Sequence, residues 1–227
     1  MSGHFISMPL EEAMRTQMAM RHLKPDEVPE DLLMHLLDLA IRAPSGSNGQ
    51  QWEFLVVRER RLVAEFARIN RNAFRVGRWL GYLKPTEKNR KMIESVTYQA
   101  DHFEEIPVLV VACLRGWVTP FPFIAVSSLF GSIYPAVQNL LLAARGAGLG
   151  AALITVPLWN QGKARKLLGL PRNLHPCCMI PLGWPLREYR PNKRRPVAEV
   201  VHFDRYGNRP RPPQQMTPGT YLPDGPL

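Results

Sequence analysis

Residues 43–54 form a stretch that is dense in side chains able to bind a small molecule. The stretch reads APSGSNGQQWEF, and Pro44 ends any helix before it because proline cannot continue the helical hydrogen bonds. Gly46 and Gly49 can take positive φ, so we expect successive backbone N–H groups to turn toward a ligand. The polar side chains supply donors and acceptors: Ser45, Ser47, Asn48 and Gln50. Most loops of this composition are only polar connections, so its role depends on the elements around it.

The remaining sequence contains no familiar catalytic group. The 6 histidines are isolated, and the 3 cysteines form neither a zinc pattern nor a disulfide framework. The run Gly146-x-Gly148-x-x-Ala151 matches a dinucleotide-binding string, but here the glycines are expected to leave a helix and enter a strand, which is the reverse of that motif. One polar loop, isolated arginines and no evident catalytic side chain are typical of an enzyme whose bound cofactor carries the chemistry.

Composition places the 227-residue chain among globular proteins, with 45% hydrophobic and 21% charged residues. No apolar run reaches the ~18 residues of a membrane span. The first residues also lack the basic and apolar segments of a secretory signal. The sequence therefore predicts a reduced cytoplasmic protein with no membrane segment.

The formal charge of +10 is concentrated in two stretches, residues 58–91 and 187–211. A basic local field suits phosphorylated small molecules as well as polyanions. No zinc finger, recognition helix or basic motif interleaved with aromatic residues is present. We therefore expect no nucleic-acid partner, although a non-catalytic flavin- or polyanion-binding protein is kept as a hypothesis from another class.

The first half of the chain is predicted to be mainly helical. Ser7 can cap a helix that runs to about Met20, and Pro29 begins a second helix whose leucines recur at helical spacing as far as the loop. Residues 54–57 then form a buried strand, and residues 58–105 are basic and mostly helical. The polar loop is thus expected between an amphipathic helix and a strand.

The second half is predicted to alternate strands and helices. Residues 115–130 are aromatic and suit a loop or lid, Ser132 can cap a helix that ends at residues 146–150, and Gly169 ends a short helix over 161–168. The first expected strand is apolar on both faces and therefore central. The expected strands are 108–113, 151–156, 177–182 and 197–203.

Strands and helices in this order indicate an α+β fold, a layered α/β arrangement with a small central mixed sheet covered by helices. We expect a single domain over residues 1–208. The proline-rich tail over residues 209–227 has no internal periodicity, so it either wraps a partner or is disordered.

Four ordered segments resemble the nitroreductase family, and together they cover about residues 12–207. The order and number of these matches make the resemblance specific, whereas any one alone would be weak. They are an N-terminal signature (18–29 with 39–57), a central dimer helix and turn (134–150), and two C-terminal elements (181–185 and 193–201).

The resemblance implies a nitroreductase-like, FMN-binding fold in a domain-intertwined homodimer, with the flavin at the subunit interface. Arg21 falls where a basic residue meets the ribityl-phosphate, and Lys193 or Arg194 falls on a C-terminal phosphate contact, as suits charge-assisted hydrogen bonds. The other implied flavin contacts are Pro44, Ser45, Ser47, Asn48 and Gln50 of the loop, partly from the second subunit, and Leu153, Ile154 and Thr155 near the pyrimidine side of the ring.

This chain departs from the family pattern at two places. Gln17, Met18 and Ala19 stand where many members carry Arg-Arg-Ser or Thr-Arg-Ala, so one usual phosphate arginine is missing unless Arg15 replaces it. Gln51 stands where proline is usual, between a retained glutamine and a retained tryptophan. We expect FMN binding to survive both changes.

The resemblance implies an FMN-dependent oxidoreductase of ping-pong type. NADH or NADPH would reduce the flavin, and a flat acceptor such as a nitroaromatic or a quinone would reoxidise it at the same exposed face. Residues 58–91 are a candidate lid, or only a solvated helical face. Flavin destruction and reductive dehalogenation remain alternatives within the same fold, and the sequence names neither the acceptor nor the preferred nicotinamide nucleotide.

Overall fold

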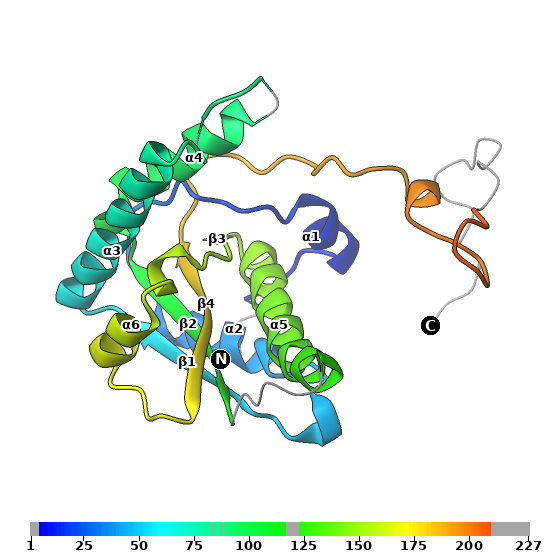
Figure 1. Cartoon of the computed structure of the whole chain (residues 1–227), viewed down its shortest axis with the longest axis horizontal. Coiled ribbons are helices and arrows are strands. Elements are labelled where there is room, and N and C mark those ends of the chain that lie inside the picture. Colours follow the sequence, from blue (N-terminus) through cyan, green and yellow to red (C-terminus); the bar gives the residue numbers. More distant parts are fainter. Residues whose placement is uncertain (1–4, 83, 88, 117–122, 210–227) are drawn as a thin grey trace. The chain divides into compact units, whose positions relative to one another are not determined.

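The computed structural model describes residues 5–82, 84–87, 89–116 and 123–209, with residues 123–125 described by their backbone only. Contacts divide the chain into two compact units, Met1–Pro191 and Asn192–Leu227. The first unit holds the sheet and all the α-helices described below (Figure 1). The domain limits expected from the sequence, 1–208 and 209–227, stay a prediction.

A four-stranded antiparallel sheet forms the centre of the first unit, in the order β1-β2-β4-β3. Residues Val108 to Leu114 of β2 are at most 1% exposed, because helices cover both faces of the sheet, and this confirms the predicted central strand. The expected mixed sheet is corrected in one respect: every pairing among the described strands is antiparallel. The strands are β1 (Trp52–Val57), β2 (Val108–Arg115), β3 (Gly150–Ala151) and β4 (Leu174–Gly183).

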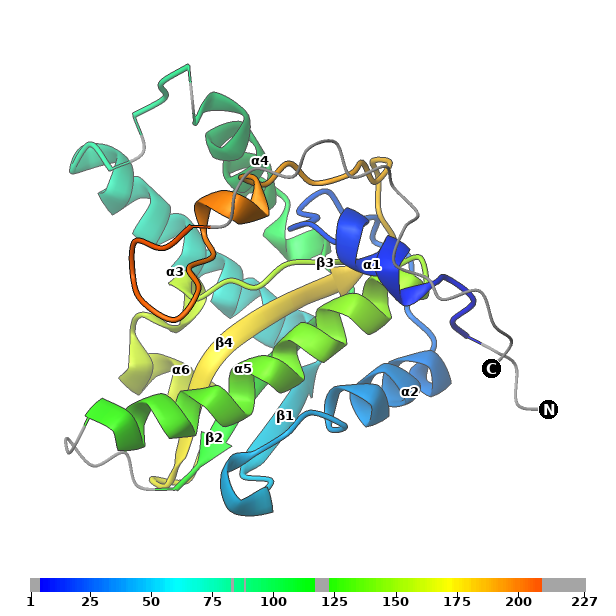
Figure 2. The same ribbon diagram turned by 90° about the vertical axis from the view of Figure 1, so that its right-hand side faces the viewer.

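Helices α2 (Glu30–Ala40) and α5 (Phe123–Gly146) cover one face of the sheet (Figure 2). Helix α2 begins directly after Pro29, as predicted. Helix α5 begins earlier than expected, so Ser132 lies inside it and is not its cap. The Ser132 hydroxyl instead donates to the Ser128 carbonyl one turn earlier, at 3.1 Å. Of the predicted loop or lid at 115–130, residues 117–122 lie outside the described residues, and the part from Phe123 is helical.

The apolar content of α5 follows from its place in the core. Within the described residues, Val126–Gly146 alone is long and apolar enough to cross a membrane by length and composition. Ile133, Val137 and Leu140 of this segment are instead at most 1% exposed and pack with the sheet and α2.

Helices α3 (Arg60–Trp79) and α6 (Gln161–Leu168) cover the opposite face of the sheet, and α4 (Arg90–Asp101) packs against α3. The prediction of a mainly helical 58–105 is confirmed. Helix α6 has the predicted bounds because Asn160 accepts a hydrogen bond from the Lys163 N–H, and Gly169 ends the helix in the left-handed conformation at φ 63°. Figure 1 shows α3 and α6 on one side of the sheet and α5 on the other.

Two predicted segments near the ends of the chain are wrong in their extent or type. Helix α1 is only Leu10–Thr16, with Pro9 and not Ser7 at its start, because the following residues leave the helix and pair with the sheet: the Met20 N–H donates to the Ala151 carbonyl at 3.0 Å. The expected strand at 197–203 is absent, and a 3₁₀ turn at Val197–Glu199 stands there within the second unit.

The predicted strand at 151–156 is mostly replaced by irregular backbone. Regular pairing covers only Gly150–Ala151, and Ile154 then forms an isolated bridge with Met179 of β4. A 3₁₀ turn at Val156–Leu158 follows. The segment therefore runs along the edge of β4 without forming a regular strand, and Leu153 to Val156 line a cavity.

Candidate functional site

A cavity of about 220 Å³ lies between the segment around Arg21, helices α3 and α4, and the irregular residues after β3. It brings together four residues that the sequence assigned to one site. Its lining consists of Arg21, Asn70, Phe74, Val96, Gln99, Leu153, Ile154, Thr155 and Val156.

Two polar atoms of this cavity have no hydrogen-bond partner, Nε of Arg21 and Nε2 of Gln99. Burial lowers the pKa of the Arg21 guanidinium, because desolvation disfavours its charged form. A buried donor without a partner costs roughly 1–3 kcal/mol, and more if it is charged. The cavity is therefore prepared for a ligand whose edge presents hydrogen-bond acceptors or negative charge.

An open apolar groove of about 490 Å³ adjoins this cavity, and the two share Phe74 and Val156. The wall of the groove comes from the C-terminal half of α3 and from the turn before α6. Its apolar residues include Val76, Leu80 and Trp159, which are 53%, 51% and 70% exposed. A cavity with two unpartnered donors thus adjoins a larger apolar groove.

The polar loop is ordered by bonds to α5 and within itself. The Gly46 N–H donates to the Ser132 hydroxyl at 3.0 Å, and the Gln50 N–H donates to the Ser45 hydroxyl at 3.0 Å. The Gln50 amide also donates to Asn48 Oδ1 at 3.2 Å. None of the predicted loop residues lines the cavity at Arg21 within this chain: Pro44, Ser45, Ser47, Asn48 and Gln50.

The glycines of the loop serve a different purpose from the one expected. Positive φ occurs at Ser47, Asn48 and Gln50, at 50°, 53° and 46°, and not at either glycine. A Cβ on Gly46 would lie 3.2 Å from Ser128 Oγ, so this glycine permits close packing against α5. Three non-glycine residues in the left-handed region are strained, and such strain concentrates at ligand-binding loops.

The predicted phosphate contacts stay untested by the structure. Lys193 and Arg194 belong to the second unit, where Arg194 donates to the Lys193 carbonyl at 3.0 Å. Arg15, the possible substitute for the missing arginine, pairs with Glu11 at 2.7 Å, and its side chain is 73% exposed. The role of all three toward a phosphate stays a prediction.

Sequence reasoning missed the buried amides Asn70 and Gln99. Asn70 on α3 is 3% exposed and Gln99 on α4 is 4% exposed. Each interrupts an otherwise apolar buried helix face, which was the available signal. The apolar residues of 58–105 looked too scattered for their helical faces to be assigned, so these polar interruptions went unnoticed.

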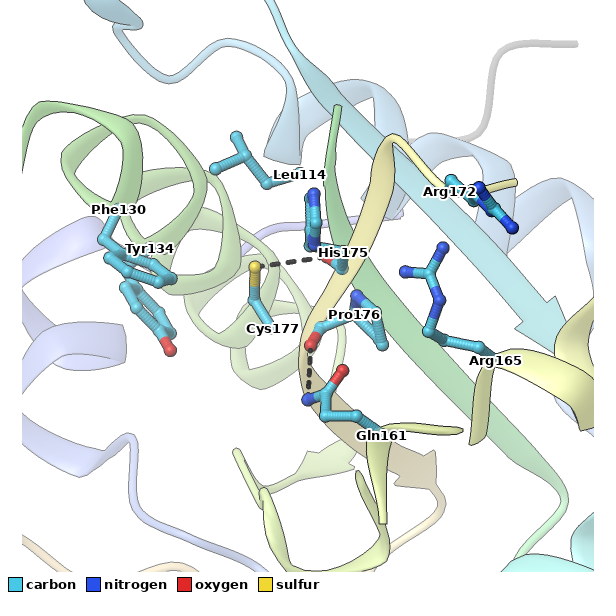
Figure 3. A pocket seen from close by; sticks show the side chains of 9 residues that line it. All are labelled: Leu114, Phe130, Tyr134, Gln161, Arg165, Arg172, His175, Pro176 and Cys177. Atoms are coloured by element: carbon cyan, nitrogen blue, oxygen red, sulfur yellow. Dashed lines mark hydrogen bonds between the residues drawn. The ribbon is translucent and has the colours of Figure 1, made fainter. Parts of the chain in front are cut away.

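A larger cavity of about 750 Å³ lies at the other end of β4 and contains none of the predicted site residues (Figure 3). Several of its polar side chains bond to backbone carbonyls. Arg165 donates to the carbonyls of Leu174 and Pro171, and Gln161 donates to the Pro176 carbonyl at 3.5 Å. Burial raises the pKa of the Cys177 thiol to about 11, so this thiol is neutral. We therefore place the candidate site at the smaller cavity.

Known proteins share sequence with most of this chain. The model of the Nitroreductase family matches residues 14–184. An NADH dehydrogenase of Thermus thermophilus is 28% identical over 188 residues, which are 81% of this chain and 90% of that protein. An iodotyrosine deiodinase of Thermotoga neapolitana is 27% identical over 185 residues, 80% of this chain and 89% of that protein.

A solved structure of iodotyrosine deiodinase bound to FMN and 3-iodo-L-tyrosine shares the fold, with a TM-score of 0.68 and 23% identity over 87% of this chain and 100% of the other. The chain belongs to the nitroreductase family, because the family match covers most of its length. It is accordingly an enzyme, a flavin oxidoreductase.

The residues at the cavity fit a flavin. The pyrimidine part of the isoalloxazine ring carries carbonyl oxygens and ring nitrogens along one edge, and the unpartnered donors of Arg21 and Gln99 match acceptors of this kind. The backbone after β3 supplies a further polar wall at Leu153 to Thr155. The adjoining apolar groove would receive a flat molecule beside the ring.

Proposed function

We propose that this protein is an FMN-dependent enzyme that takes hydride from NADH or NADPH and passes it to a flat electrophilic acceptor of the nitroaromatic or quinone class. The observation that carries the proposal is the cavity lined by two residues with unpartnered donors, Arg21 and Gln99, beside an apolar groove. Family membership and the name of the Thermus thermophilus relative support it.

The flavin, when bound, supplies the redox chemistry by accepting a hydride from one substrate and delivering it to the next. The resemblance assigned Arg21 to the ribityl-phosphate, but Arg21 lines the same cavity as Leu153, Ile154 and Thr155 and would therefore join their backbone in holding the pyrimidine end. Burial in this cavity removes water from these donors, which strengthens their hydrogen bonds to the ring. Lys193 or Arg194 would hold the phosphate.

The open groove supports a permissive ping-pong enzyme. Both substrates must use one exposed face of the ring in turn, so the first product has to leave before the acceptor enters. The wall formed by Val76, Leu80 and Trp159 is well exposed and apolar. The charged residue that lines the groove, Lys163, pairs with Glu65 at 3.5 Å. Broad acceptor use is the expected consequence.

Reductive dehalogenation is the second candidate, and the identity to iodotyrosine deiodinase of Thermotoga neapolitana favours it. That chemistry would need a closed lid with polar groups selecting its substrate. The exposed apolar residues at the end of α3 favour the first reading. The rates at which different acceptors reoxidise the reduced enzyme distinguish the two candidates. Faster reoxidation by quinones or nitroaromatics than by halophenols would favour the first.

A homodimer is part of the proposal. Helix α5 exposes Ser127, Gly131, Tyr134 and Gln138 on one side, which would leave this side available to pack against a second helix. The outer edge of β1 has no neighbour among the described strands, and Val197, Val200 and Phe203 of the second unit are 70%, 51% and 58% exposed. An intertwined dimer would bury these surfaces and bring the polar loop, from Pro44 to Gln50, to the partner's flavin. A cytoplasmic location, with no nucleic-acid or membrane partner, remains part of this proposal.

Purification and anaerobic reduction test the proposed function. We expect a yellow protein with the absorption bands of FMN, bleached by NADPH or NADH in the absence of oxygen and restored by a quinone or a nitroaromatic. A colourless protein that takes up no added FMN and oxidises neither nucleotide would overturn the proposal. Stopped-flow reoxidation by quinones, nitroaromatics and halophenols would then name the acceptor class.

A further inference from the structure

The buried amide of Gln99 is a polar group whose presence in the core the fold does not explain. Gln99 is 4% exposed, and its Nε2 has no hydrogen-bond partner. Val96 lies three residues earlier on the same side of α4, and both residues line the same cavity. Desolvating a donor without pairing it is unfavourable, and native proteins do so rarely. A ligand acceptor would account for this amide.

A stack of three rings holds α4 beside the segment that carries Arg21. The rings of His22 and Tyr98 lie 4.0 Å apart between centroids and are inclined by 19°, and those of Tyr98 and His102 lie 4.2 Å apart. Arg21 and Gln99 are the chain neighbours of the first two stacked residues. The stack therefore fixes the two unpartnered donors with respect to each other.

We propose that Gln99 binds the flavin, its Nε2 donating beside Arg21 to the polar pyrimidine edge of the ring. This inference rests on the proposed function and adds a residue that the resemblance did not assign. Two-electron reduction leaves negative charge along this edge, so donors there bind the reduced cofactor more tightly than the oxidised one. Gln99 therefore raises both the affinity for FMN and its reduction potential.

The Gln99→Leu variant separates this role from a structural one. Leucine has a similar volume and removes the buried unpaired amide, so the protein without cofactor should unfold at the same temperature or higher. The affinity for FMN should fall about tenfold, as expected for one lost hydrogen bond in a dry site. If the variant binds reduced FMN less tightly relative to oxidised FMN than the wild type does, its two-electron potential falls. Each tenfold decrease in that affinity ratio lowers the potential by about 30 mV.

The experiment compares wild type, Gln99→Leu, Gln99→Met and the control Gln161→Leu, which removes an exposed amide on α6. FMN dissociation constants come from quenching of flavin fluorescence in titrations of the apoprotein. Unfolding is followed without FMN, and potentials are measured by equilibration with reference dyes. We expect weaker binding and a lower potential in both Gln99 variants, without loss of apoprotein stability, and wild-type flavin binding in the control.

Three outcomes would overturn the inference. If Gln99→Leu and Gln99→Met bind FMN with wild-type affinity and potential, Gln99 does not contact the flavin, although the proposed function stands. If both lose apoprotein stability together with affinity, Gln99 supports the fold only. If the wild-type protein itself binds no FMN, the proposed function fails, and the role of Gln99 fails with it.

Discussion

The two cavities of this protein differ in what their polar groups do. The larger, about 750 Å³, has an arginine whose guanidinium is bonded to backbone carbonyls and a thiol kept neutral by burial. The smaller, about 220 Å³, has an arginine and an amide with unpartnered nitrogens. Folding satisfies the first set and leaves the second open. Buried polar atoms without a hydrogen-bond partner, and not the volume of the cavity, therefore indicate which cavity binds a ligand.

The largest expected effect is on FMN affinity, and it is tested by replacing the arginine of each cavity, Arg21 or Arg165, with leucine. Arg21→Leu should weaken FMN binding by about 10- to 100-fold, because a hydrogen bond to a charged group contributes roughly 1.5–3 kcal/mol. Arg165→Leu should leave FMN affinity unchanged and lower the free energy of unfolding by roughly 1–3 kcal/mol, since two carbonyls lose their donor. Flavin titration and chemical denaturation measure the two effects. Equal losses of affinity in both variants would erase the distinction between the cavities.

The hydrogen-bonding groups of the polar loop, like those of Arg165 in the larger cavity, bond within the protein. The Gln51→Pro variant tests the backbone strain that the loop carries. Proline disfavours the left-handed conformation that Gln50 has at φ 46°, so restoring the family's usual residue should lower the free energy of unfolding by about 1–3 kcal/mol. Gln51→Ala, which leaves Gln50 unrestricted, is the matched control. A Gln51→Pro protein as stable as wild type would show that the loop readily takes another conformation.

Sequence reasoning found the loop and the helix before it, because proline, glycine and apolar spacing act locally. It placed the positive φ values at Gly46 and Gly49, yet the backbone uses Ser47, Asn48 and Gln50, since packing of Gly46 against Ser128 decides the path of the chain. That contact joins residues far apart in sequence, which local propensity does not report.

The same limit explains Gln99 and the missing strands. A buried amide becomes visible only once α4 has a known inner face, and the apolar pattern of that helix was too irregular to define one. Residues 151–156 have strand-like composition, but edge pairing with β4 ends after Ala151 apart from one bridge. Pairing between distant segments determines both results.

Ser132→Ala is expected to have a smaller effect than the loop proline. The hydroxyl accepts from the Gly46 N–H at 3.0 Å, so its loss should lower the free energy of unfolding by about 1 kcal/mol and loosen the loop. Ser128→Ala is the control, because it removes a neighbouring hydroxyl but keeps the backbone carbonyl of residue 128 to which the Ser132 hydroxyl donates. Hydrogen exchange at Gly46 should accelerate only in Ser132→Ala. Unchanged exchange there would mean that the loop does not depend on α5.

The smallest effect concerns the Cys177 thiol in the larger cavity. Burial raises its pKa from 9.0 to about 11, so the neutral form stabilises the fold below pH 9, and this contribution is lost as the pH rises through 11. Because the thiolate is the nucleophile, iodoacetamide at pH 8 should modify Cys177 about a hundredfold more slowly in the folded than in the unfolded protein. Peptide mapping by mass spectrometry follows this residue separately. Modification at the unfolded rate would reveal a reactive thiolate, and the larger cavity would then also be open to chemistry.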